Sequence, residues 1–345
     1  MPIPCGADRQ GARPLGVPWL GFLEVAVLRR GRAPEILPAQ AAAALYPDVA
    51  QSIARIITPR ARFLGMTFDR PRIMGVVNVT PDSFSDGGHH NAPEAAIAHA
   101  LALAEAGADV LDIGGESTRP GATPVPEDAE MERVLPVIEG ILAAGCAVPI
   151  SIDTRKAGVA RAALAAGARL FNDVSALTHD PESPAVAREA EVVCLMHAQG
   201  DPQTMQKDPH YGDVLLDVYD FLADRVTAAE RAGMARERLM IDPGIGFGKT
   251  MAHNLALLRG LSLFQGLGCP LLLGVSRKRF IGTLSGVATA ADRVAGSLAA
   301  CLAGVAQGAQ ILRVHDVAET AQALAVWQAL GPETAPAPIP ERMNS

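Results

Sequence analysis

Eight short apolar segments, most of them followed by a helical pattern, recur between residues 72 and 329. These segments are IMGVVN, DVLDIG, VPISID, ARLFND, VVCLMH, RLMIDP, PLLLGV and AQILRV. Strands that are apolar throughout are buried on both faces, as in a parallel sheet covered by helices. Eight strand–helix units in roughly 250 residues make up a (β/α)8 barrel. The sequence therefore predicts an α/β protein built on a TIM barrel.

An open doubly wound sheet is the alternative architecture. It would be expected to carry a G-x-G-x-x-G turn after an early strand, and none of the early turns has one.

We expect three regions along the chain. Residues 1–70 form an N-terminal extension, a small α+β segment of unknown role, and residues 71–330 form the barrel. Residues 331–345 form a proline-rich tail that we expect to be disordered.

Charge and cysteine content exclude several classes of function. The net charge is −7 and no long basic run is present, so we expect no nucleic-acid partner. The five cysteines are scattered without a C-x-x-C pair, which argues against a zinc site and a disulfide framework. The N-terminal residues lack the apolar segment of a signal peptide, and no apolar run is long enough to span a membrane. We therefore predict a cytoplasmic globular protein.

Polar residues stand at the carboxyl ends of nearly all the predicted strands, where TIM barrels carry their chemistry. These positions hold Asn78, Asp112, Asp153, Asn172 with Asp173, Met196 with His197, Asp242, Ser276 to Arg279, and Arg313 with His315. Helix capping would explain one or two of them. Polar groups beside a core are costly without partners, so the whole set predicts a binding site.

The strand-end residues fall into two chemical groups. The first group suits a phosphate, with the Asn78 oxygen available to a magnesium ion; it comprises Asn78, Ser117, Thr118, Arg119, Arg313 and His315. The second group suits a flat heterocycle with several N–H groups and a carbonyl; it comprises Asp153, Asn172, Asp242 and Lys278. Buried polar groups of this kind discriminate strongly, because a wrong ring leaves them unpaired.

The segment GIGFGKT resembles a phosphate-binding P-loop but departs from it at one position. The motif requires glycine at position 243, where this chain has Pro243. Its glycines are better explained by a close approach of backbone to a ligand. Nearby, we interpret Met196 as an apolar wall of the site and His197 as a residue that supports it from behind.

Eight motifs together resemble the dihydropteroate synthase family, over about residues 72 to 329. They are NVTPDSFSDGG, DIGGESTRPGA, ISIDTRK, FNDVSAL, MHAQGDPQTMQ, IDPGIGFGK, GVSRKRFIG and RVHDV. The resemblance implies a pterin-binding barrel that condenses 6-hydroxymethyl-7,8-dihydropterin pyrophosphate with p-aminobenzoate. The products would be 7,8-dihydropteroate and pyrophosphate, Mg²⁺ would be required, and sulfonamides would inhibit.

The resemblance also implies roles for individual residues. The implied pterin contacts are Asp153, Asn172, Met196, Asp242, Gly246, Phe247, Lys278 and Arg313. The implied pyrophosphate contacts are Asn78, Arg119, Arg313 and His315, with Asn78 as the metal ligand. The implied p-aminobenzoate pocket comprises Phe84, Ser117, Thr118, Pro120, Phe247 and Ser276. Asp153, Lys278, Arg313 and His315 would be catalytic, and residues 79–88 would form a lid.

The sequence departs from the family pattern at two positions, Ala198 and Arg279, both near the expected p-aminobenzoate side of the site. Two alternative functions stay open at this point. One is a pterin methyltransferase that acts on methyltetrahydrofolate with a corrinoid partner, and the other is a non-catalytic pterin-binding paralogue. For the synthase we expect a dissociative reaction.

The segment ADRVAGSLAACLAGVAQGA is apolar or small nearly all round, so we also expect a homodimer.

Overall fold

The computed structural model describes residues 2–4, 12–80, 92–117, 121–200 and 204–331. Its centre is an eight-stranded parallel sheet in the order β11-β10-β9-β8-β7-β6-β13-β12. The strands are β6 (Arg72–Asn78), β7 (Val110–Gly114), β8 (Ile150–Asp153), β9 (Leu170–Asp173), β10 (Val192–Met196), β11 (Leu239–Asp242), β12 (Leu272–Leu273) and β13 (Ile311–Val314). A parallel bridge between Ile241 and Leu271 joins the two edge strands. The predicted TIM barrel is confirmed.

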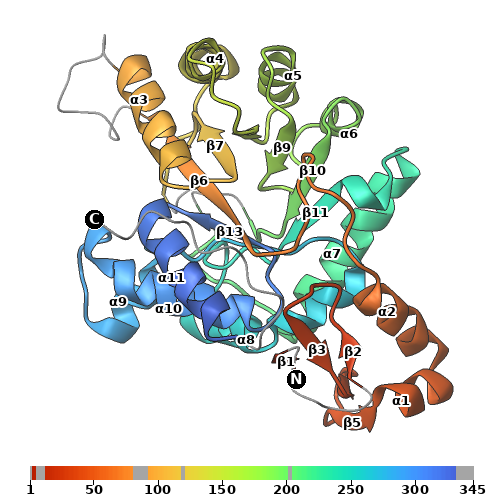
Figure 1. Cartoon of the computed structure of the whole chain (residues 1–345). Coiled ribbons are helices and arrows are strands. Elements are labelled where there is room, and N and C mark those ends of the chain that lie inside the picture. The colour runs from red at the N-terminus through yellow and green to blue at the C-terminus, as the bar shows by residue number, and fades with distance from the viewer. Residues whose placement is uncertain (1, 5–11, 81–91, 118–120, 201–203, 332–345) are drawn as a thin grey trace.

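Helices surround the sheet, as Figure 1 shows. They are α3 (Ala92–Glu105), α4 (Glu127–Ala143), α5 (Ala157–Ala165), α6 (Ser183–Ala187), α7 (Val214–Arg231), α8 (Met251–Arg259), α9 (Arg279–Ser285), α10 (Val294–Val305) and α11 (Val317–Ala329). Short 3₁₀ helices are η3 (Arg236–Arg238), η4 (Leu261–Leu267) and η5 (Ala291–Arg293). One large apolar cluster packs between strands and helices, which explains why the strands are apolar on both faces.

A second apolar cluster fills the interior of the barrel below the strand ends. Its members include Met74, Val110 and Ile311 from three of the strands. Phe63 and Phe68 belong to the same cluster, with ring centroids 5.7 Å apart. These two aromatic side chains therefore close the end of the barrel at which the strands begin, and the polar strand ends lie at the other.

The extension contains both strands and helices and lies beside the barrel (Figure 1). Its elements are β1 (Ile3–Pro4), β2 (Arg13–Pro14), β3 (Leu20–Phe22), β4 (Glu24–Val27), β5 (Glu35–Pro38), α1 (Ala39–Leu45) and α2 (Pro47–Ile57). It has its own apolar cluster, with Leu20, Phe22 and Ile53 nearly fully buried. The boundaries at residues 70 and 330 stay predictions, and the expected tail lies almost wholly outside the described residues.

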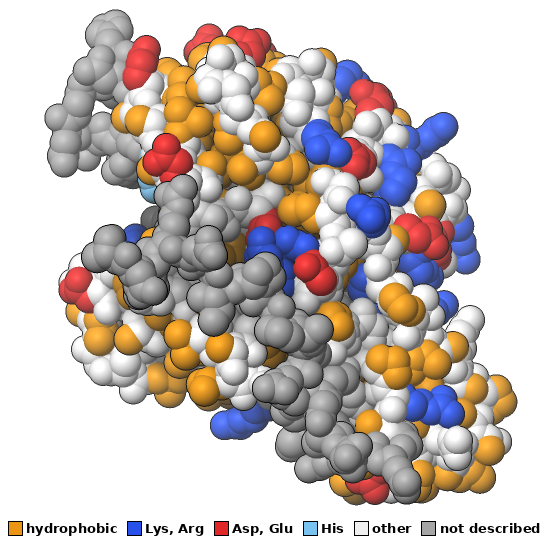
Figure 2. All heavy atoms as spheres, viewed as in Figure 1, with side chains coloured by type: hydrophobic (Ala, Val, Ile, Leu, Met, Phe, Trp, Pro, Cys, Tyr) orange, Lys and Arg blue, Asp and Glu red, His pale blue; other side chains and the backbone are white. Residues whose placement is uncertain are grey.

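The surface carries charges of both signs, and the described cysteines form no disulfide. Acidic and basic side chains are interspersed on the face seen in Figure 2. Cys146, Cys194, Cys269 and Cys301 are free thiols. In the described part of the chain, no helix combines the length and the apolar character needed to cross a membrane.

A candidate active site at the strand ends

Three charged side chains meet at the carboxyl ends of β7, β8 and β13. Arg313 donates from Nε to Oδ2 of Asp112 and from Nη2 to Oδ2 of Asp153, both at 2.6 Å. The Asp112 side chain is fully buried, and that of Asp153 is only 11% exposed. A cation shared between two carboxylates leaves the trio with net negative charge, which suits a ligand that donates hydrogen bonds or becomes positive.

Asp112 also holds Asn172, which lies near the end of β9. Nδ2 of Asn172 lies 3.2 Å from Oδ2 of Asp112 and 3.4 Å from its Oδ1. One buried carboxylate thus orients two residues for which sequence analysis predicts pterin contacts. Asp112 was predicted to lie at a strand end but not to have a role of its own, so the structure adds it to the site.

The buried Oδ1 atom of Asp153 has no hydrogen-bond partner among the residues that the structure describes. A buried acceptor without a partner is costly unless a ligand or water satisfies it. Burial raises the pKa of Asp153 to about 7; Arg313 opposes this increase and the Asp112 carboxylate adds to it. Burial by itself would lower the pKa of Arg313, but the two carboxylates hold that pKa above its ordinary value. Arg313 is therefore always charged, whereas Asp153 titrates near neutrality.

Asp242 and Lys278 lie together across the next part of the site. A Cβ placed on Gly274 would lie 3.7 Å from Oδ2 of Asp242, 3.8 Å from Nζ of Lys278 and 3.9 Å from Cβ of Arg313. Burial raises the pKa of Asp242, with Lys278 opposing, and burial lowers the pKa of Lys278 to about 8, with Asp242 opposing. Any side chain larger than that of glycine at position 274 would therefore contact the charged groups of both Asp242 and Lys278.

The loop after β11 borders this space with backbone and an aromatic ring. Nζ of Lys278 donates to the carbonyl of Ile245 and lies 4.7 Å from the centre of the Phe247 ring. Gly246 adopts a φ of +89°, and a Cβ there would lie 3.4 Å from Cδ of Lys278. Met196 ends β10 with its side chain 5% exposed, and a Cβ placed on Gly244 of this loop would lie 3.4 Å from its Cγ. Gly246 and Phe247 thus lie beside Lys278, and their pterin roles, like that of Met196, stay predictions.

A buried Lys249–His197 pair supports this loop from behind, and sequence analysis missed the lysine. Nζ of Lys249 lies 2.9 Å from Nδ1 of His197 and donates to the carbonyl of Phe247 at 2.9 Å. Burial, and then the Lys249 charge, lowers the pKa of His197 to about 3, so its ring is neutral at physiological pH. In the sequence only the segment GFGK draws attention to this lysine, and that segment resembles a phosphate-binding motif.

The predicted pyrophosphate side of the site is described in part. Asn78 ends β6 with its side chain half-buried. His315 follows β13, and its Nδ1 lies 3.1 Å from Oγ of Ser276, which is 6% exposed. The structure thus joins a residue predicted for pyrophosphate with one predicted for p-aminobenzoate.

The loop after β7 carries further predicted contacts and is held at its base by Glu116. Oε1 of Glu116 accepts from the backbone N–H of Val125 at 3.2 Å, and Lys156 donates to its Oε2 at 2.8 Å. Ser117 is half-buried at the start of this loop. Thr118, Arg119 and Pro120, together with Phe84 and most of the predicted lid, lie outside the described residues.

Comparison with known proteins agrees with this geometry. The family model described as "Pterin binding enzyme" matches residues 74–315. A dihydropteroate synthase of Neisseria meningitidis serogroup B is 51% identical over 286 residues, which are 81% of this chain and 99% of the relative. The structure of Xanthomonas albilineans dihydropteroate synthase with 4-aminobenzoic acid is 54% identical, with a TM-score of 0.73, and covers 79% of this chain and 96% of that one. A Yersinia pestis dihydropteroate synthase solved with a sulfonamide drug is 46% identical, with a TM-score of 0.73, over 78% and 97%.

The chain therefore belongs to the family of pterin-binding enzymes. Within that family it is a transferase of the dihydropteroate synthase class, as are relatives that share 45% to 51% of its residues. These relatives give no support to the methyltransferase or to the non-catalytic paralogue. The family model begins at Met74, so the extension lies outside it.

Proposed function

We propose that this enzyme joins 6-hydroxymethyl-7,8-dihydropterin pyrophosphate to p-aminobenzoate at the strand ends by a dissociative reaction. The observation that carries the proposal is the buried Asp112–Arg313–Asp153 trio, which has one carboxylate oxygen unpaired among the described residues. Such a site favours a planar N–H donor that gains positive charge as it reacts. The dihydropterin ring has that character.

Pterin recognition would use the four polar residues around this trio. Oδ1 of Asp153 would accept a ring N–H, and Asp242 would accept the paired amino and ring N–H groups at the other edge. Asn172 and Lys278 would pair with the remaining ring nitrogen and carbonyl positions. All of these side chains are partly or fully buried, so a ring that leaves one of them unpaired would bind weakly.

In the reaction, the bond between the pterin methylene carbon and the pyrophosphate oxygen breaks first, and its electron pair leaves with pyrophosphate. Arg313 and His315, with the predicted Arg119, would stabilise the charge on the leaving oxygens. The methylene cation is delocalised into the ring, where the ionised Asp153 would stabilise it. The neutral amine of p-aminobenzoate then forms the new C–N bond and loses its extra proton to solvent or pyrophosphate.

Asn78 fits the predicted magnesium site. It ends β6 with its side chain half-buried, and Mg²⁺ commonly takes one or two protein oxygens together with waters and substrate phosphates. In the described residues no cluster of three His, Cys, Asp or Glu side chains suits a metal, so a site built mainly on the substrate is the better fit. When bound, Mg²⁺ would neutralise charge on pyrophosphate. Asn78 would hold it at the end of β6.

The second substrate would bind beside Phe247 and Ser276, together with the predicted Phe84, Ser117, Thr118 and Pro120. Related synthases have been solved with 4-aminobenzoic acid and with a sulfonamide drug, which supports p-aminobenzoate as substrate and sulfonamides as inhibitors of this chain. The cytoplasmic location stays a prediction.

The dissociative step can be tested by a secondary kinetic isotope effect. Deuterium on the pterin methylene should give a large normal effect on kcat/KM, because that carbon becomes trigonal before the amine attacks. An isotope effect near unity would instead indicate that the amine and the leaving group are both bonded in the transition state. Asp153→Asn should slow the reaction and keep the effect large.

A homodimer is the assembly that the exposed helices support best. α10 carries Ala295, Ala299 and Ala303 along one stripe, and the adjacent elements expose Leu284 and Leu330 at 60% and 82%. Small residues at this spacing allow close packing of a second helix. Ala299→Arg should convert a dimer into a monomer in light scattering while leaving the unfolding transition nearly unchanged.

A further inference from the structure

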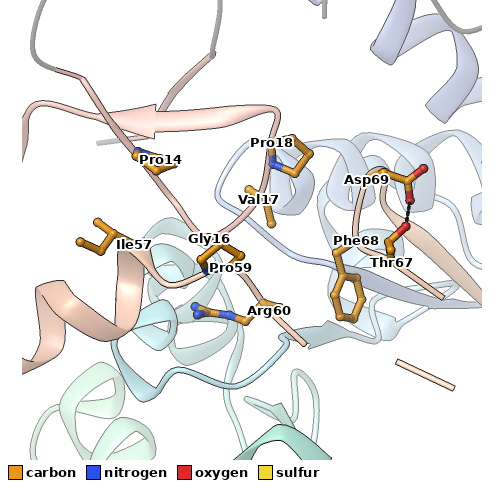
Figure 3. Close-up of a pocket in the computed structure, with 10 residues that line it drawn as sticks. All are labelled: Pro14, Gly16, Val17, Pro18, Ile57, Pro59, Arg60, Thr67, Phe68 and Asp69. Carbon is orange, nitrogen blue, oxygen red and sulfur yellow. Dashed lines mark hydrogen bonds between the residues drawn. The ribbon is translucent and has the colours of Figure 1, made fainter. Parts of the chain in front are cut away.

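One contact of the extension with the barrel lies at the end where the strands begin, close to where β11 and β12 meet. Arg60 lies where the chain passes from the extension into the barrel, at the edge of a cavity of about 330 Å³ (Figure 3). Its Nη1 donates to the carbonyls of Arg55 and Thr58 at 2.8 and 2.9 Å. Its Nη2 reaches the barrel instead, where it donates to the carbonyl and Oε1 of Gln265 at 3.1 and 3.0 Å.

The β11–β12 contact is the most sparsely bonded junction of the barrel. β10 and β11 pair over four residues, and β6 and β7 pair over five. In the described part of the chain, β11 and the β12 segment share a single bridge, Ile241 with Leu271, and the N–H of Ile241 donates to the carbonyl of Pro270 at 3.0 Å. We call this junction the seam. Few backbone bonds make it the easiest place for the barrel to open.

A chain of hydrogen bonds leads from Arg60 to this seam. Oε1 of Gln265 accepts from Arg60 and also from Nε2 of Gln310 at 3.0 Å. Oε1 of Gln310 in turn accepts from the backbone N–H of Leu271 at 2.7 Å. Leu271 is the residue that bridges to Ile241. Both glutamine side chains are fully buried, so a lost partner there would not be replaced by water.

The same seam carries two of the residues that read the pterin in the proposed function. Asp242 is the last residue of β11, and Lys278 follows β12. Their side chains must keep one spacing to contact the same ring. A shift between β11 and β12 would change that spacing directly, whereas strands such as β7 and β10 have longer ladders on both sides.

We propose that Arg60 is a positioning residue through which the extension holds the seam and so fixes the spacing of Asp242 and Lys278. The inference rests on the proposed pterin-binding role of these two residues. The extension then contributes to the affinity for dihydropterin pyrophosphate from the far end of the barrel.

The test compares two full-length variants with the wild type. Arg60→Met removes the donors to Gln265 with similar side-chain length. Arg30→Met is the matched control, because Arg30 also joins the extension to the barrel, through ion pairs with Asp217 and Asp220 on α7, and neither aspartate belongs to the hydrogen-bond chain from Arg60 to the seam. Hydrogen exchange of residues 239–245 and 268–273 is measured without substrate, and KM is measured for each substrate.

For Arg60→Met we expect faster exchange in the two seam segments than in β6 to β9. We expect KM for dihydropterin pyrophosphate to rise roughly three- to tenfold, with KM for p-aminobenzoate nearly unchanged. Arg30→Met should change neither. If Arg60→Met does not fold, Arg60→Lys, which keeps the charge and up to three donors, should show the same changes at smaller size.

Two results would overturn the proposal. One is exchange that is unchanged in the seam or raised equally throughout the barrel, and the other is faster seam exchange with an unchanged KM for dihydropterin pyrophosphate. Failure of the proposed function would look different. In that case Asp242→Asn would leave the pterin KM unaltered, while the exchange result for Arg60→Met would still stand by itself.

Discussion

Nε of Arg313 donates to Oδ2 of Asp112 across 2.6 Å at the bottom of the site, and the carboxylate that accepts is fully buried. Asp112 therefore works through its neighbours. It fixes the guanidinium of Arg313 and the amide of Asn172, and its charge contributes to the raised pKa of Asp153. Three residues of the proposed pterin site thus depend on one side chain that is itself inaccessible to solvent.

Asp112→Asn should lower kcat/KM for dihydropterin pyrophosphate about 10- to 100-fold, the size expected when a charge-assisted hydrogen bond worth about 1.5–3 kcal/mol is lost. It should also lower the pKa of Asp153, because a like charge is removed and Arg313 is left to one carboxylate. Steady-state kinetics as a function of pH measures both effects.

Asp109→Asn provides the matched control for Asp112→Asn. Asp109 forms ion pairs with Arg70 and Arg72 next to β6, with its side chain 7% exposed, at the end of the barrel opposite the site. It should reduce stability and leave the pH profile in place. Equal kinetic losses in both variants would show that Asp112 matters only for folding.

The pH dependence of kcat/KM should have two limbs. Activity should rise as Asp153 ionises around pH 7 and should fall as Lys278 loses its proton around pH 8. Lys278→Arg should move the alkaline limb to higher pH, since arginine stays charged. A limb that keeps its position in Lys278→Arg and in Asp153→Asn belongs to a substrate, and would contradict the assignment.

Stability should respond to Asp153 in a defined direction. Its pKa is raised in the folded state to about 7, so between about pH 4 and 7 the folded protein holds a proton that the unfolded chain has released. The free energy of unfolding should therefore fall as pH rises through this range. In Asp153→Asn the fall should be smaller, as measured by urea denaturation at a series of pH values.

Gly274→Ala should leave the fold intact and weaken pterin binding. The added methyl would meet Asp242, Lys278 and Arg313 at 3.7 to 3.9 Å, which are ordinary contact distances, so strain should be small. It would nevertheless take up space beside the charged groups of Asp242 and Lys278, where the pterin is proposed to bind. We expect KM for dihydropterin pyrophosphate to rise about tenfold, for a loss of about 1.4 kcal/mol. An unchanged KM together with a normal melting temperature would place the pterin elsewhere.

Gly244→Ala should be far more damaging than Gly286→Ala, although both glycines have positive φ. At Gly244 a Cβ would lie 1.8 Å from the carbonyl oxygen of His197, whereas at Gly286 nothing lies within 4 Å. Left-handed backbone by itself costs about 1–2 kcal/mol, which is what we expect at Gly286. At Gly244 the loss should exceed about 3 kcal/mol. Equal losses in chemical denaturation would contradict the close approach between the loops that follow β10 and β11.

The barrel could be predicted because strand and helix patterns are local properties of the sequence. The polar residues at strand ends could be predicted too, since a side chain such as Asp242 or Arg313 is conspicuous directly after or within an apolar run. The role of Asp112 could not, because its partners come from strands distant in sequence. The role of Lys249 could not be predicted for a related reason, because its contact with His197 depends on how the loops after β10 and β11 pack against each other.

The extension was the least predictable part. Its helices and strands carry local signals, but nothing in its sequence shows that Arg60 faces Gln265, more than two hundred residues further along the chain. The sparse pairing of β11 with β12 at the seam could not be predicted either, because it is known only from the single bridge between Ile241 and Leu271 in the structure. Long-range hydrogen bonds of this kind come from tertiary structure.

Steady-state release of pyrophosphate from dihydropterin pyrophosphate is the most direct measurement of what this site does. With Mg²⁺ and p-aminobenzoate, the wild-type chain should release pyrophosphate and form dihydropteroate in equal amounts. Asn78→Ala should reduce the rate by about 100-fold or more, as expected when charge stabilisation of a leaving group is lost. Pterin binding without release by the wild type, or full activity in Asn78→Ala without a requirement for Mg²⁺, would contradict the proposed mechanism.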